Sequence, residues 1–145
     1  MSITYEEFMD RLSKSDSRIS MNIRSVLLKQ SLKMEADAKR NATHFPRVQT
    51  GRLRNSISGN VINFQNEDYL VLRAGGISTP SRPFTESADV VYAAIQEYGG
   101  TIEMKGGSRF IKEKRYLRNA FDKHRDRTKS LIDKAIIASL KGKDL

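Results

Sequence analysis

The sequence predicts an α+β fold in which a small antiparallel sheet packs with a long N-terminal helix and a long C-terminal amphipathic helix. Apolar residues recur at helical spacing near both ends of the chain. Between them lie short stretches that suit strands, separated by glycine pairs. With 145 residues, the chain has the size of a single domain and can bury a core without a disulfide or a metal.

The N-terminal part is expected to form two helices. Thr4 and Glu7 have the spacing of a capping box, which predicts a short helix over residues 4–14 as an extension of the domain. Ser15–Ser17 then offers N-caps for a long helix over residues 17–43.

The long helix is expected to end before Pro46, which a helix interior does not accommodate. Its apolar face is broad, and this width predicts cover from more than one side. The stripe consists of Ile19, Ile23, Val26, Leu27, Met34 and Ala38, widened by Leu28, Leu32 and Ala36.

A sheet region is expected over residues 57–112. The stretches Ile57–Phe64 and Tyr69–Ala74, joined by a polar turn at Gln65–Asp68, predict an antiparallel hairpin. Thr101–Lys105 predicts a third strand that glycines close.

The segment 75–89 is predicted to be a long exposed loop, because it is polar and holds two prolines and adjacent glycines. A loop of this length suggests a contact with a neighbouring protein, for which Arg82 and Phe84 are the candidates. The stretch 90–98 that follows suits a strand or a short helix equally well by pattern.

The C-terminal segment predicts one long amphipathic helix over residues 115–141. Its apolar positions recur three or four residues apart and include a histidine: Leu117, Ala120, Phe121, His124, Thr128, Leu131, Ile132, Ala135, Ile136, Ser139 and Leu140. We expect His124 to be packed and hydrogen-bonded rather than to bind a metal.

Composition excludes several classes of protein. The chain has a formal charge of +9 and no cysteine, so thiolate metal sites, disulfides and cysteine nucleophiles are ruled out. The longest apolar run, Val90–Ile95, is far too short for a membrane span, and acidic residues near the N-terminus do not suit a secretory signal. An intracellular protein without membrane contact is expected.

Positive charge is concentrated between Arg109 and Lys129, which holds 9 basic and 3 acidic residues. One interpretation is a solvated helix face on which aspartates moderate the charge. The other is a surface that meets DNA or an acidic protein, although interleaved aromatics for stacking on bases are missing. The candidate contacts are Arg118, Lys123, Arg125, Arg127 and Lys129.

Signals for catalysis are weak. Asp89, Glu103 and Lys105 resemble the carboxylates and lysine of a magnesium-dependent nuclease, but alternation along a strand explains Glu103 and Lys105 equally well. Neither His44 nor His124 has a companion at metal spacing, and the glycine pairs lack the sequence of a phosphate loop. We therefore expect no enzyme, and no catalytic, cofactor-binding or metal-binding residues.

Three segments, taken in order, resemble a known family. They are Pro46–Ile57 (PRVQTGRLRNSI), Val91–Thr101 (VYAAIQEYGGT) and Arg115–Phe121 (RYLRNAF), the last leading into the terminal helix. Together they are similar to the neck and tail-completion proteins, also called head–tail joining proteins or tail components, of long-tailed bacteriophages. The resemblance covers about residues 17–141 and implies that 90–98 is helical.

The resemblance implies a structural virion protein at the phage head–tail junction, assembled in the cytoplasm of the bacterial host. It would form a homo-oligomeric ring, for which six copies is one expected number, that joins the tail tube to the head connector around the DNA channel. Its partners would be other neck, connector, tail-tube or tail-terminator proteins, with non-specific DNA contact. A free basic nucleic-acid-binding protein is the alternative, and a metal-dependent nuclease is a third interpretation.

The motifs also suggest interface residues. Arg52 and Glu97 are expected to form an ion pair within or between subunits, whereas the plain alternative has Glu97 solvated and Tyr98 in the core. The motif and interface candidates are Thr50, Gly51, Arg52, Leu53, Arg54, Tyr92, Glu97, Tyr98 and Gly99.

Overall fold

The computed structural model describes residues 4–44, 52–75 and 88–141. The helices and strands follow one another as α1 (Tyr5–His44), α2 (Arg52–Ser56), β1 (Ser58–Phe64), β2 (Glu67–Arg73), α3 (Ala88–Tyr98), β3 (Gly100–Met104), β4 (Gly107–Ile111) and α4 (Tyr116–Leu140). None of the helices in these ranges is both long and apolar enough to cross a bilayer.

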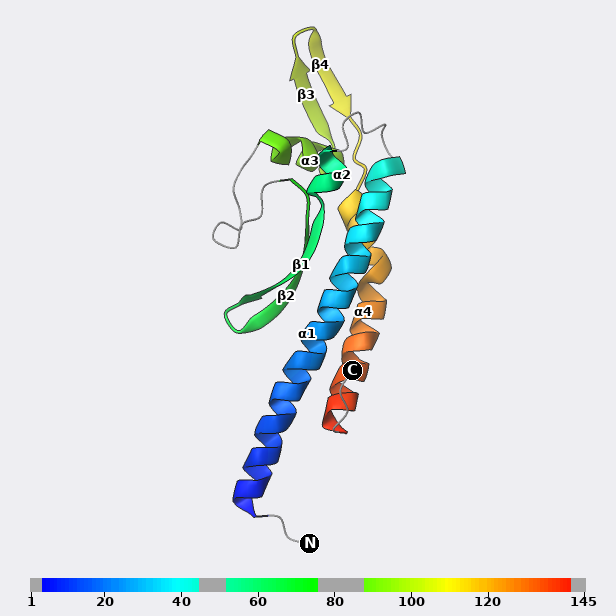
Figure 1. Ribbon diagram of the computed structural model, residues 1–145. Coiled ribbons are helices and arrows are strands. Elements are labelled where there is room, and N and C mark those ends of the chain that lie inside the picture. Colours follow the sequence, from blue (N-terminus) through cyan, green and yellow to red (C-terminus); the bar gives the residue numbers. More distant parts are fainter. Residues whose placement is uncertain (1–3, 45–51, 76–87, 142–145) are drawn as a thin grey trace.

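The molecule is elongated and is built on α1 and α4, which lie side by side and run in opposite directions (Figure 1). The β1–β2 hairpin curves along one side of α1. Helices α2 and α3 gather near the C-terminal end of α1, and the β3–β4 hairpin projects beyond them. The N-terminal part of α1 extends past the end of α4.

The predicted α+β class is confirmed, with long helices near both ends of the chain and antiparallel strands between them. The strands do not form a single sheet. Within the described ranges, β1 pairs with β2 and β3 pairs with β4, giving two separate two-stranded sheets.

The predicted break between a helix over 4–14 and a helix over 17–43 is wrong, because α1 is continuous from Tyr5 to His44. Its range holds no glycine or proline, and the hydroxyl and acidic residues at 15–17 sit in the helix without ending it. The predicted capping box is confirmed at the start of α1. The Thr4 N–H donates to Glu7 Oε2 (3.2 Å), and the Glu7 N–H donates to Thr4 Oγ1 (3.3 Å).

The core lies where α1, α2, α3 and α4 meet. Small side chains on α1 and α4 let the helices approach closely, and Leu72 of β2 packs against the resulting cluster. The core residues are Ala38, Ala42, Leu53, Ile57, Ala93, Tyr116 and Ala120.

The apolar face of α1 is covered by α4 and, on another side, by the β1–β2 hairpin. Val26, Leu27, Met34 and Ala38 are buried as predicted, but Leu28, Leu32 and Ala36 are exposed. The expected cover from more than one side is therefore confirmed, and the three exposed residues lie on the part of the circumference that α4 and the hairpin leave open.

The predicted hairpin at 57–74 is confirmed, with a shorter turn. Gln65 and Asn66 both have positive φ (51° and 65°), which is the geometry of a two-residue turn that matches strand twist. In the resulting register Val61 lies opposite Leu70, and Gly59 lies opposite Leu72.

Among the remaining elements, helix α2 and one strand were not expected from the sequence. Residues 90–98 are helical within α3, and α4 matches the predicted helix over 115–141 to within one residue at each end. Strand β3 was expected, whereas its partner β4 was not recognised in the sequence. Most of the predicted loop 75–89, with Arg82 and Phe84, lies outside the described residues, and its last two residues belong to α3.

Candidate functional site

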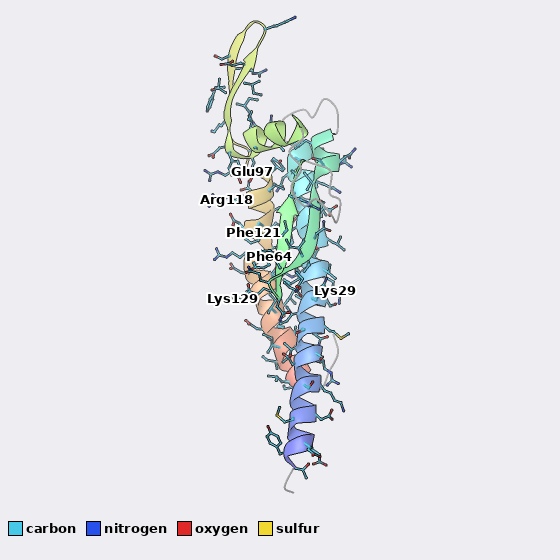
Figure 2. The ribbon with its side chains drawn as sticks, turned by 90° about the vertical axis from the view of Figure 1, so that its left-hand side faces the viewer. Lys29, Phe64, Glu97, Arg118, Phe121 and Lys129 are labelled. Carbon is cyan, nitrogen blue, oxygen red and sulfur yellow. The ribbon has the colours of Figure 1, made fainter. Side chains whose placement is uncertain are left out.

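Glu97, in the last turn of α3, is the centre of the joint between α3 and α4. Its side chain is only 4% exposed. The N–H of Leu117 donates to Glu97 Oε2 and the N–H of Arg118 donates to Glu97 Oε1, both at 2.9 Å. Figure 2 shows Glu97 at the upper end of α4, just above Arg118. Glu97 therefore caps the positive N-terminus of α4 from a different helix.

Backbone hydrogen bonds at this joint connect the end of α3 to the start of α4. Gly99 has a φ of 78°, its N–H donates to Ile95 O (2.8 Å), and the chain can then turn from α3 into β3. After β4, the N–H of Arg115, itself in a left-handed conformation, donates to Glu97 O (3.1 Å). The sequence Glu-Tyr-Gly thus ends one helix and caps another.

Tyr116, the first residue of α4, also connects α4 to α3. Its ring is buried, and its hydroxyl donates to Ala93 O at 3.3 Å. Burial, together with the nearby negative charge of Glu97, raises the pKa of the Tyr116 hydroxyl far above its ordinary value. Tyr116 therefore remains a neutral hydrogen-bond donor.

The plain interpretation of Glu97 and Tyr98 is wrong in both parts. Glu97 is buried and hydrogen-bonded, whereas Tyr98 is 76% exposed and lies outside the core. The ion pair between Arg52 and Glu97 stays a prediction, because the side chain of Arg52 is outside the described set.

The other motif residues divide between core and surface. Leu53 is buried in the core, and Arg54 is exposed. Gly99 lies against the backbone of β4 and the following segment, since a Cβ there would be 2.9 Å from Glu113 N. Thr50, Gly51 and the side chain of Tyr92 lie outside the described residues.

The five basic candidates on α4 are all exposed. Figure 2 shows Arg118 near the upper end of α4, with Phe121 and Lys129 further along the helix. Arg118 lies 3.9 Å from Asp122, and Lys123 Nζ lies 2.8 Å from Asp37 Oδ2 on α1. Lys123 is therefore a link between helices, while the exposed side chains of Arg125, Arg127 and Lys129 can meet an anionic surface.

Asp37 collects three cationic or polar partners at the α1–α4 interface. Besides Lys123, it contacts Arg40 Nη1 (3.0 Å) and His124 Nε2 (2.9 Å). The hydrogen bonds from Lys123 and His124 outweigh burial and lower the pKa of Asp37 below its ordinary value. The prediction that His124 is packed and hydrogen-bonded is confirmed.

Replacing Asp37 by asparagine is expected to lower the free energy of unfolding at pH 7 by about 2 kcal/mol, because a buried carboxylate with charged partners is lost. The folded-state pKa of Asp37 is depressed, so its stabilising effect is complete above its ordinary pKa of 3.8 and declines as the pH falls through the lower folded-state value. Urea denaturation should therefore show a difference in the free energy of unfolding between wild type and Asp37→Asn that narrows below about pH 4.

Asp126→Asn is the matched control for this experiment. Asp126 is an exposed aspartate on α4, and its replacement should change stability by less than about 0.5 kcal/mol. A gap between wild type and Asp37→Asn that stays constant from pH 7 to pH 3 would contradict the ionised role of Asp37.

Two of the three residues of the nuclease interpretation lie at exposed positions of one hairpin. Glu103 lies on β3 and Lys105 in the turn before β4, both at the surface of the projecting hairpin. The side chain of Asp89 is outside the described set. Across the described ranges, no three histidine, aspartate or glutamate side chains are grouped so that they could hold a metal ion.

Sequence reasoning missed one feature of the surface, which is the amount of uncovered apolar area. Large side chains are exposed on α1, on both hairpins and at the end of α4, including Leu28, Leu32, Phe64, Tyr69, Phe110, Ile137 and Leu140. Several of them belong to stripes or strands that were expected to be covered.

Searches for similarity identify no relative of the chain: no family model matches it, and no curated protein or solved structure does.

Proposed function

We propose that this protein is a structural virion protein that forms a homo-oligomeric ring at the bacteriophage head–tail junction, joining the tail tube to the head connector around the DNA channel. The proposed role is geometric and requires no catalytic centre. Its partners are copies of itself and the neck, connector and tail proteins above and below the ring.

The observation that carries the proposal is the apolar surface left uncovered on opposite parts of one subunit. Leu32 on α1 is 63% exposed, and Phe110 on β4 is 72% exposed. A monomer in water gains nothing from such exposure, whereas a subunit with neighbours on two sides buries it. The resemblance of the three sequence motifs to the tail-completion family gives this assembly its place in the virion.

The exposed basic residues of α4 fit the same role. Arg118, Arg125, Arg127 and Lys129 are exposed, and Asp122 and Asp126 lie among them. Mixed charges give a moderate positive field, which suits a channel through which a polyanion slides. The same exposure is what favours the alternative, a free nucleic-acid-binding protein.

The purified protein is expected to assemble into rings, which sedimentation and negative-stain electron microscopy will detect. Binding of duplex DNA at physiological salt is expected to be weak and without sequence preference. Replacing Arg125, Arg127 and Lys129 by glutamine should leave the fold intact, because all three are exposed. A subunit that stays monomeric, yet binds a DNA sequence tightly and loses this binding in the triple variant, would favour the alternative.

A further inference from the structure

Strand β1 has an open edge beside an exposed apolar stripe. Because Gln65 and Asn66 form a two-residue turn, Phe64 and Glu67 are a hydrogen-bonded pair, and the pairs alternate along the hairpin from there. The N–H and C=O groups of Val61 and Asn63 therefore point away from β2. No other strand of the described chain pairs with this edge.

The floor beside this edge is the uncovered side of α1. Leu28, Leu32 and Glu35 lie at i, i+4 and i+7 and so share one face of the helix. Glu35 marks the position of β1 over that face, because Glu35 Oε2 accepts the N–H of Gly59 at 2.9 Å. The opposite edge of the hairpin is not comparable, since β2 is the strand that α4 contacts more.

A second open edge of the described chain belongs to the projecting hairpin. Met104 and Gly107 close the β3–β4 turn, so the N–H and C=O groups of Ser108 and Phe110 point away from β3. Residues 107–110 of β4 are all exposed. Two-stranded hairpins with both faces in water are marginally stable by themselves, so this hairpin is suited to pairing with another strand.

We propose that β4 of one subunit pairs antiparallel with the β1 edge of a second copy, forming a four-stranded intermolecular sheet that is the contact between neighbours in the ring. This inference rests on the proposed function. Within one subunit, the β3–β4 hairpin extends away from α3, whereas the turn between β1 and β2 points toward the opposite end of the molecule (Figure 1). The β4 strand that reaches the β1 edge therefore belongs to a second copy.

The alternation of side chains sets the register of this contact. Gly59 already donates its N–H to Glu35, so Val61 and Asn63 are the β1 residues left to pair, with Phe110 and Ser108. Paired residues carry their side chains on the same face of a sheet, and the face of Gly59 and Val61 looks toward α1. Phe110 of the neighbour therefore covers Leu28 and Leu32.

Charge and polarity favour β4 over β3 as the incoming strand. In β3, the residues whose N–H and C=O groups point away from β4 are Thr101 and Glu103. If β3 paired with the β1 edge in place of β4, the Glu103 carboxylate would lie on Leu28 and Leu32. With β4, Lys112 comes opposite Gly59 and beside the Glu35 carboxylate. The contact joins two different surfaces of the subunit, and a contact of this kind generates a ring when the rotation between neighbours closes.

A disulfide cross-link tests the register, because the native chain contains no cysteine. Ile62 and Arg109 form the non-hydrogen-bonded pair between Val61–Phe110 and Asn63–Ser108, with a Cα separation of about 4.5 Å that a disulfide spans. Both residues are exposed, so neither cysteine should disturb the fold. Mixing Ile62→Cys with Arg109→Cys under mild oxidation should give covalent dimers.

Ser108→Cys is the matched control, because residue 108 is adjacent to 109 but points to the other face of the sheet. Its mixture with Ile62→Cys should cross-link at least about tenfold less, and either variant alone should stay uncrosslinked, since the contact never places two copies of one residue together. If the protein forms rings but the two mixtures cross-link equally, or neither cross-links, this inference is overturned and the proposed function stands. A protein that does not self-associate would contradict both.

Discussion

Replacing Gly59 by alanine is expected to lower the free energy of unfolding by about 3 kcal/mol and the melting temperature by about 10 °C. A Cβ at position 59 would lie 2.4 Å from Ser31 O and 2.9 Å from Ser31 C, both backbone atoms of α1. Backbone atoms in the middle of a helix cannot move aside, so the hairpin has to lift from α1. Thermal unfolding followed by circular dichroism measures the change.

Gly106→Ala provides the matched control for Gly59→Ala. A Cβ at position 106 meets no atom within 4 Å, so this variant should unfold within about 0.5 kcal/mol of the wild type. Moving β1 away from α1 also breaks the hydrogen bond that the Gly59 N–H donates to Glu35, and this hydrogen bond positions the open edge of β1. Gly59→Ala should therefore weaken self-association as well, and a variant of unchanged stability would contradict the close approach.

The long helices were predictable because their signal is local. In α4, apolar residues recur with one period over the whole helix, and Leu117 through Leu140 identify it without tertiary information. The ends of elements are less local. Ser15–Ser17 has the residue types of an N-cap, but nothing in the chain forces α1 to stop there, and helix propagation prevails.

Strand β4 was missed because its sequence lacks the strand pattern. Gly107, Ser108 and Arg109 do not alternate in polarity, and only Phe110 and Ile111 favour a strand. The pairing with β3 through a two-residue turn creates the strand, and it leaves Phe110 exposed. Such a strand is stabilised by its neighbours rather than by its own propensities.

The partners of charged residues depend on tertiary contacts. Asp37 lies on the buried face of α1 between Met34 and Ala38, and His124 lies on the apolar stripe of α4. The position of Asp37 and His124 on the apolar stripes of two helices could have predicted that the two side chains meet. For Glu97 the motif marked the residue, but its partners Leu117 and Arg118 are backbone amides, which carry no sequence signature.

Replacing Glu97 is expected to uncouple α3 from α4. Glu97→Ala should lower the free energy of unfolding by about 3 kcal/mol, because two charge-assisted hydrogen bonds and the interaction with the helix dipole are lost together. Glu97→Gln keeps one acceptor oxygen and should cost about 1 kcal/mol. Chemical denaturation of the three proteins measures this order of stability.

Glu113→Ala separates capping from loss of charge near the same helix. Glu113 is exposed and forms an ion pair with the exposed side chain of Arg115 at 2.7 Å, so its replacement should cost less than about 0.5 kcal/mol. Amide hydrogen exchange adds a local readout. If Glu97 caps α4, the amides of Leu117 and Arg118 should exchange at least about tenfold faster in Glu97→Ala than in Glu113→Ala, while amides in the middle of α4 change less. Equal exchange at these two amides would show that α4 begins without help from α3, and that the Glu-Tyr-Gly motif has its effect elsewhere.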